Sequence, residues 1–194
     1  MLALPPSAAP ARPRTLLVGV GAAIAACTVL LGSMLATYLN VRDEVGGGTT
    51  GAWLKKTVVP EVAANMMLII VFGASVLVQW AVYAIARGDR RHTGYALGLT
   101  ALFGLAAINT QSYIWRTVKL ALAKGPYQTM FYVVTGTLVM FLVAGIVVAI
   151  ITAFRSLGGR YSATDTDGVA AAALFWHFLS VATCAVWYVM YVVK

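Results

Sequence analysis

Five long apolar runs constrain the fold of this chain more than any other feature of its sequence. They cover approximately residues 16–39, 60–86, 94–115, 127–154 and 168–193. Each is long enough for a helix to cross the hydrocarbon core of a bilayer, which takes about 20 residues. Only 10% of the 194 residues are charged, whereas a soluble domain carries about 25%. The sequence therefore predicts an all-α integral membrane bundle of five transmembrane helices.

The polar segments between the runs define how the chain is organised. Residues 1–14 are rich in Pro and Ala, and we predict that they form a disordered N-terminal tail. The first apolar run continues unbroken from Leu16 to Leu39, so we interpret it as an uncleaved span rather than a signal peptide. Residues 15–194 are predicted to form a single transmembrane helical bundle. The apolar runs are too long for the strands of a β-barrel.

The net charge of +8 comes from basic residues at the ends of the apolar runs. This placement is typical of contacts with lipid headgroups, so we do not expect nucleic acid as a partner. If the spans alternate in direction, seven basic residues fall on each side of the membrane, and the count does not decide the topology. The tight arginine-rich connection at 87–91 favours the N-terminus inside.

The interiors of the predicted spans are nearly free of ionisable groups. All six Asp and Glu residues lie in connections or, for Glu61, at the mouth of a span. Proton relays, ion-coupled transporters and di-iron carboxylate sites need such groups within the membrane, so these functions are disfavoured. The sequence also lacks a Ser/His/Asp set, a glycine-rich nucleotide loop and metal-ligand spacing. It indicates a chain without catalytic, cofactor-binding or metal-binding residues.

The polar side chains inside the spans are candidates for structural hydrogen bonds. His177 is the one histidine within a span, and haem usually needs a second axial ligand, so haem binding by this chain alone is disfavoured. We expect His177 to bond to a neighbouring helix, with Gln79 or Gln111 as its partner. Asn109, Tyr113 and Trp176 are further candidates for contacts between helices. Gln79 and Tyr83 are four residues apart and therefore share a helix face.

Several motifs of this chain follow one another in an order and spacing typical of a known family. The strongest is Phe175-Trp176-His177-Phe178, followed by an aromatic-rich helix that runs to Lys194. The stretch 131–136 reads Phe-Tyr-Val-Val-Thr-Gly, Gln79 precedes a basic turn, and Gln111 and Tyr113 fall in register. Taken together, these motifs resemble subunit III of the haem-copper cytochrome c oxidases in its five-helix, actinobacterial short form, which has Phe-Tyr-x-x-Thr-Gly and a similar Gln in these places.

The chain departs from this family at several polar positions. Cys27 stands where the family typically carries a glutamate in a membrane helix, and Ile114 stands where a second glutamate is common. Leu138 and Phe141 replace two expected histidines, and Ser180 replaces an aspartate. In the family these groups are linked to lipid binding and to proton uptake by subunit I.

The resemblance implies a non-catalytic subunit of a haem-copper terminal oxidase in aerobic respiration. It implies a multi-pass protein of the bacterial plasma membrane with its N-terminus inside and its C-terminus outside. Subunits I and II are the expected partners and would hold the haem and copper, while membrane phospholipid is an expected ligand of this chain. An accessory subunit-III-like protein of a nitric oxide reductase, or an orphan homologue, is the alternative. A small transporter is the least favoured function.

Overall fold

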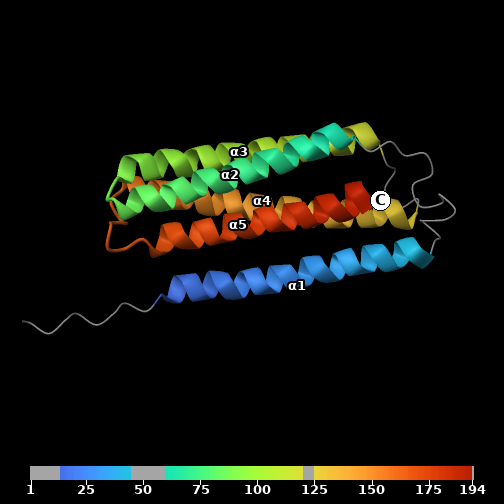
Figure 1. The fold of residues 1–194 in the computed structure, drawn as a ribbon, viewed down its shortest axis with the longest axis horizontal. Helices are drawn as coiled ribbons and strands as arrows, with labels where there is room; N and C mark the ends of the chain where they lie inside the picture. Colours follow the sequence, from blue (N-terminus) through green and yellow to red (C-terminus); the bar gives the residue numbers. More distant parts are fainter. Residues whose placement is uncertain (1–13, 45–59, 120–124, 194) are drawn as a thin grey trace, which may run out of the picture.

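In the described part of the protein, five long helices run along one common axis (Figure 1). The computed structural model describes residues 14–44, 60–119 and 125–193, so the tail predicted at 1–14 lies outside the described residues apart from Arg14. Each of the five helices is long and apolar enough to cross a membrane. The helices are α1 (Thr15–Glu44), α2 (Glu61–Ala86), α3 (Arg90–Val118), α4 (Pro126–Leu157) and α5 (Asp167–Trp187), the last continued by the π-helical η1 (Tyr188–Val193).

The predicted spans agree with the helices in order and position, but most of the helices are longer. α3 begins four residues before the predicted 94–115 span and ends three residues after it, and α4 exceeds the predicted 127–154 span at both ends. The predicted ends were placed at the first polar residues. A helix keeps its hydrogen bonds beyond the hydrocarbon core, so its polar terminal turns extend into the interface. One result is that His92, which precedes the predicted 94–115 span, lies in the first turn of α3.

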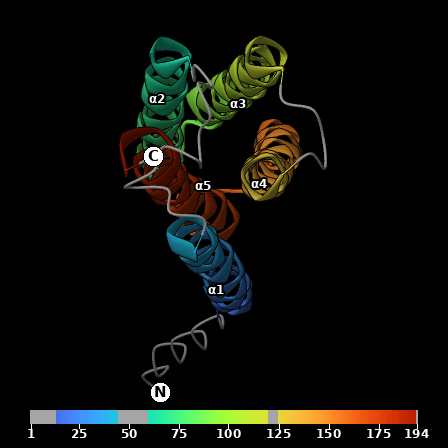
Figure 2. The same ribbon diagram turned by 90° about the vertical axis from the view of Figure 1, so that its right-hand side faces the viewer.

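Helix α5 lies at the centre of the bundle. The end-on view shows α1, α2 and α4 arranged around α5, with α3 between α2 and α4 (Figure 2). Helices α2 to α5 form a closed ring of packed neighbours, whereas α1 packs only on the side formed by α5 and α4. Accordingly, Leu31 and Tyr38 are the only buried residues of α1.

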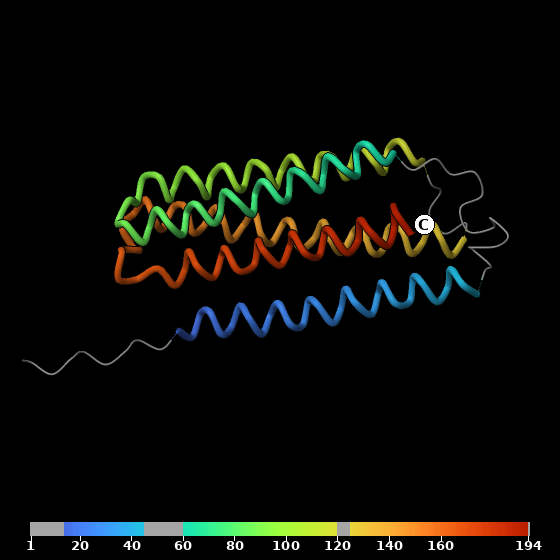
Figure 3. The backbone as a smooth tube through the Cα atoms, viewed as in Figure 1, coloured from blue at the N-terminus to red at the C-terminus, as the bar shows by residue number. Residues whose placement is uncertain are grey.

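The two ends of the bundle differ in how the chain turns. The α2–α3 and α4–α5 connections both lie at one end, as the backbone trace shows (Figure 3), and we call this the short-loop end. Helices α1, α3 and η1 finish at the opposite end, which we call the C-terminal end. Successive helices run in opposite directions. Because their number is odd, α1 begins at the short-loop end and η1 finishes at the C-terminal end.

Both connections at the short-loop end begin with the same helix-ending motif. Gly88 follows α2 with φ +76° and Gly159 follows α4 with φ +79°, a left-handed conformation that glycine adopts without steric cost. In each case the next N–H, of Asp89 or Arg160, donates to a carbonyl five residues earlier at 3.0 Å. These are Schellman motifs, which satisfy the last carbonyls of a helix and reverse the chain within a few residues.

Candidate functional site

The main polar cluster within the membrane-spanning region joins α2 to α5. His177 of α5 lies between Ser75 and Gln79, which are four residues apart on α2 and therefore on one face. The Ser75 Oγ and His177 Nδ1 atoms are 2.5 Å apart, and His177 Nε2 lies 3.0 Å from Gln79 Oε1. The imidazole thus bridges two successive turns of the neighbouring helix.

The chemistry of the partners assigns the proton on the His177 ring. An amide oxygen can only accept a hydrogen bond, so Nε2 carries the proton and donates it to Gln79 Oε1. The neutral ring then accepts at Nδ1 from the Ser75 hydroxyl. Both ring nitrogens are satisfied without a charge in the membrane, where an unpaired charge would be costly. This arrangement leaves neither nitrogen available as a metal ligand.

The cluster lies beside a pocket of about 400 Å³ on the outer surface of α2 and α5. Its lining combines the cluster with apolar and aromatic side chains, namely Ser75, Val76, Gln79, Trp80, Tyr83 and His177. The Trp80 and Tyr83 side chains are 43% and 60% exposed. Tyr83 thus shares the pocket with Gln79, but it is Ser75, on the other side of Gln79, that contacts His177.

Further interhelical hydrogen bonds place α5 against both of its ring neighbours. Trp176, which is fully buried, donates from Nε1 to the Gly145 carbonyl of α4 at 3.2 Å. Ser180 Oγ lies 3.3 Å from the Val71 carbonyl of α2, and Trp187 Nε1 donates to Asn65 Oδ1 at 2.8 Å. Residues 176, 177, 180 and 187 therefore give the second half of α5 polar contacts with its neighbours.

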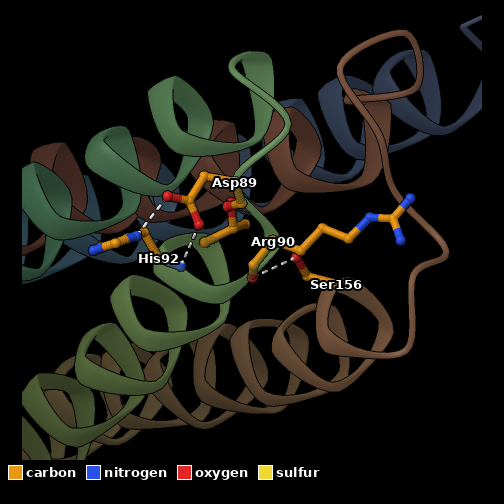
Figure 4. Close-up of polar contacts among 5 residues, drawn as sticks. Asp89, Arg90, His92 and Ser156 are labelled. Atoms are coloured by element: carbon orange, nitrogen blue, oxygen red, sulfur yellow. Dashed lines mark hydrogen bonds and ion pairs between the residues drawn. The ribbon is translucent and has the colours of Figure 1, made fainter.

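A second polar group lies at the short-loop end (Figure 4). Asp89 caps α3, because its Oδ1 accepts from the His92 backbone N–H at 3.0 Å while Oδ2 lies 2.6 Å from His92 Nδ1. The bond from the His92 backbone N–H lowers the pKa of the Asp89 carboxyl below its usual value. Ser156 Oγ donates to the Arg90 carbonyl at 3.4 Å and ties the end of α4 to the start of α3.

The other residues singled out from the sequence do not join this cluster. Gln111 is 1% exposed on α3 but lies near the C-terminal end, away from His177. Asn109 and Tyr113, expected between helices, are exposed on α3. Cys27 is half-buried and packs against the apolar core. Ser75, the residue that the prediction for His177 lacked, has a sequence signal in its i,i+4 spacing to Gln79.

Most of the positions that differ from the resembled family are filled by packing rather than by polar contacts. Ile114 and Leu138 are fully buried, and Phe141 is 8% exposed and packs against Phe178 with ring centroids 5.9 Å apart. Ser180 keeps a polar atom, and its hydroxyl bonds to backbone carbonyls. Within residues 14–44, 60–119 and 125–193, no group of three His, Cys, Asp or Glu side chains is placed to hold a metal ion.

Comparisons with known proteins show which family this chain belongs to. A family model described as cytochrome c oxidase subunit III matches residues 26–194. The cytochrome c oxidase subunit 3 of Bos taurus is 28% identical and that of Salmo salar 30% identical, each over 123 residues. Each of these matches covers 63% of this chain and 46% of the relative, so the matched region is about half the length of these curated relatives. Because the family model covers most of the chain, this protein belongs to the cytochrome c oxidase subunit III family.

Proposed function

We propose that this chain is a non-catalytic subunit III of a haem-copper terminal oxidase, which supports subunit I structurally. The observation that carries the proposal is the family match over residues 26–194. The state of the polar groups in the spans supports the non-catalytic role. Both ring nitrogens of His177 form hydrogen bonds, one with Ser75 and one with Gln79. These bonds hold α2 and α5 together and leave no nitrogen free to act in a reaction.

The outer surface supports a role in an assembly within the membrane. α2 exposes an apolar stripe at helical spacing, formed by Val62, Met66, Ile69, Phe72 and Val76. Such a surface contacts either lipid or the helices of another membrane subunit. We place the haem and copper in the partner subunits I and II, and the chain in a bacterial plasma membrane with its N-terminus inside.

We also propose that phospholipid binds this subunit. An apolar groove of about 390 Å³ between α3 and α4 supports this, and it is lined by Gly94, Gly98, Ala101, Leu102, Leu105, Ile150, Ala153, Phe154 and Leu157. Nothing lies within 4 Å of the position that a Gly98 side chain would take. The groove lies towards the short-loop end, where Arg90 and Arg155 are exposed and suit an anionic headgroup.

A nitric oxide reductase accessory subunit is the second candidate. The replacement of polar family positions by the buried Ile114, Leu138 and Phe141 favours it, because these side chains retain packing but not the polar groups linked to proton uptake. The same bundle would then support a different haem protein.

The test is a mild-detergent pull-down of the tagged full-length chain from native membranes, followed by a reduced-minus-oxidised spectrum and lipid analysis of the eluate. A terminal oxidase with its haem and copper is the expected partner. Co-purification of a nitric oxide reductase in its place supports the second candidate. Recovery of the chain with no haem protein under several mild detergents contradicts both.

A further inference from the structure

The pocket beside His177 contains hydrogen-bond donors that have no partner in the bundle. Gln79 Oε1 accepts from His177 Nε2. Among the described residues the Gln79 side chain forms no other bond, so both N–H groups of its Nε2 remain unpaired. Gln79 is half-buried and lines the pocket. An unpaired N–H group is costly in the hydrocarbon of a bilayer, where no water is present to accept from it. We therefore expect an acceptor in this pocket.

The depth of Gln79 in the membrane separates its amide from the lipid headgroups. α2 has 26 residues and is therefore about 39 Å long, whereas the hydrocarbon core of a bilayer is about 30 Å thick. Gln79 lies seven residues before Ala86, the last residue of α2, which corresponds to about 10 Å along the axis. With α2 upright and centred in the bilayer, Gln79 lies roughly 6 Å inside the hydrocarbon.

The walls of the pocket are mostly apolar and aromatic. Its volume is about 400 Å³, and Val76, Trp80 and Tyr83 line it together with the polar cluster. Sites for small molecules have volumes of about 300–1,000 Å³ and combine apolar and aromatic walls with a few polar groups. The Trp80 indole also lies beside His92 of α3, with the ring centroids 6.2 Å apart. This contact restrains the indole that forms one wall of the pocket.

The lining does not favour a charged occupant. Its polar members are Ser75, Gln79 and His177, and the His177 ring is neutral because Nδ1 accepts from Ser75. Among the described residues that line the pocket, none carries a charge. A phosphate or a carboxylate would therefore lose its water without gaining a cation as partner. An occupant that matches the lining is uncharged, offers an oxygen acceptor to Gln79 Nε2 and has a flat apolar body that lies against Trp80.

We propose that this pocket binds a membrane quinone, with one ring carbonyl accepting a hydrogen bond from Gln79 Nε2. A quinone is uncharged, its carbonyl oxygens only accept hydrogen bonds, and its planar ring packs against an aromatic wall. Its apolar tail extends into the lipid, because the pocket lies on the outer surface of α2 and α5. A phospholipid matches the pocket less well, because its phosphate stays at the interface. The proposal is independent of which respiratory complex contains the chain.

Fluorescence quenching tests this binding in the full-length chain, reconstituted in nanodiscs of phosphatidylcholine. The probe is a benzoquinone with a decyl tail, which quenches the emission of an indole that it contacts. Quenching is expected to saturate as the probe concentration rises, and Trp80→Phe is expected to remove the saturable part. Quenching that rises without saturation, or saturable quenching that is unchanged in Trp80→Phe, would overturn the proposal.

Two matched variants test whether the probe occupies this pocket. Val76→Phe adds bulk to the lining and retains the side chains that bond to His177, so half-saturation is expected to need a several-fold higher probe concentration. Val62→Phe makes the same change at another exposed position of α2, outside the pocket, and is expected to leave half-saturation unchanged. Equal half-saturation in the two variants would contradict the proposed place of binding.

Infrared spectra of a probe with isotope-labelled carbonyls test the hydrogen bond to Gln79. Hydrogen bonding lowers the stretching frequency of a carbonyl, so the bound probe is expected to show a band below that of the probe in empty nanodiscs. Gln79→Leu is expected to abolish this band. Because Gln79→Leu also removes an acceptor of His177, Val76→Phe provides a second readout, in which the band weakens with the loss of binding. An unshifted carbonyl band on binding, or displacement of the probe by an anionic phospholipid, would contradict a quinone site.

Discussion

Trp176 shows how one side chain joins three helices. Its fully buried indole extends from α5 and donates a hydrogen bond to the Gly145 carbonyl on α4. On α3, a Cβ added at Gly104 would lie 2.8 Å from the ring, closer than real side chains approach. The indole and the two glycines therefore form one packing unit, in which the absent side chains make room for the large one.

This packing predicts a difference between two identical glycine substitutions. Gly104→Ala is expected to destabilise the bundle by about 1–3 kcal/mol, because its Cβ forces Trp176 or Ile146 to move. Gly136→Ala is the control, since nothing lies within 4 Å of its Cβ, and it should be neutral or stabilising by up to about 1 kcal/mol. Unfolding of both variants in detergent measures the difference. Equal stability of the two variants would refute the packing unit.

The His177 cluster predicts an energetic coupling between two residues on different helices. Gln79→Leu removes the acceptor of the Nε2–H bond, and His177→Leu removes the donor. The double variant should therefore be more stable than the sum of the two losses predicts. The coupling energy is expected to be about 0.6 kcal/mol and at most about 1.7 kcal/mol, the range for such bonds in membranes.

Unfolding measurements on the wild type, both single variants and the double variant give this coupling energy. The same cycle with Tyr83→Phe in place of His177→Leu serves as the control, because the exposed Tyr83 side chain has no described bond to Gln79. A coupling energy of zero for the His177 cycle would show that the hydrogen bond adds nothing to helix association.

At the scale of elements, α3 owes its sharp start to the residue before it. Asp89 accepts from the His92 N–H, which is one of the N–H groups that a helix start leaves unsatisfied. Its carboxylate also lies at the positive end of the helix dipole. Together with the Schellman motif at Gly88, this cap lets α2 and α3 pack as antiparallel neighbours with a three-residue connection.

The cap predicts a pH dependence that is specific to Asp89. Its pKa is lowered in the folded chain, so its stabilising contribution is present above the unfolded pKa of 3.8 and is lost as the pH falls through the lower, folded value. Asp89→Asn keeps an acceptor oxygen but has no charge to titrate. The Tm difference between wild type and Asp89→Asn is therefore expected to shrink as the pH falls below about 4.

Thermal unfolding of both proteins between pH 3 and pH 7 checks this expectation. Asp89→Ala, which removes the acceptor as well, should lower Tm further than Asp89→Asn at neutral pH. A Tm difference that grows as the pH falls below about 4 would have the opposite sign and would rule out the charged cap as its source.

At the scale of the whole molecule, the bundle has two chemically different ends. The short-loop end carries the two glycine turns and the exposed arginines 87, 90, 91, 155 and 160. The C-terminal end carries the buried tyrosines 38, 127 and 191. The proposed orientation, with the N-terminus inside, places the short-loop end on the cytoplasmic side, where arginine-rich short loops are favoured.

The proposed topology predicts that cysteine labelling of intact spheroplasts gives a different result at each end of the bundle. In a background with Cys27 and Cys184 replaced by Ala, Thr164→Cys places an exposed thiol at the short-loop end and Thr129→Cys places one near the C-terminal end. An impermeant maleimide is expected to label Thr129→Cys in intact spheroplasts and Thr164→Cys only after permeabilisation. The reverse pattern would invert the proposed topology.

Much of the fold follows from sequence because its main determinant is local. Whether a run spans the membrane depends on its length relative to the thickness of the bilayer. This can be judged without knowing which other helices the run packs against. The five helices and their order were predicted in this way. The helix ends were less accurate, as at His92, because a polar residue marks the edge of the lipid and not the end of the backbone hydrogen bonds.

Only part of the candidate site was predicted from the sequence. Gln79 was one of two partners expected for His177, and the structure chooses it over Gln111 and adds Ser75. Asn109 and Tyr113 have the same kinds of side chain as interhelical residues but lie on the exposed face of α3. The runs are apolar on all sides, so their sequence does not reveal which face meets a neighbour.

The sequence by itself determined that the chain spans a membrane five times and that its spans hold few ionisable groups. Only the tertiary structure decided which polar side chains meet: His177 with Ser75 and Gln79, and Trp176 with Gly145. The physical reason is that span length depends on the solvent, whereas a hydrogen bond between helices depends on how each helix is rotated about its axis. That rotation is set by the packing of small and large residues between helices.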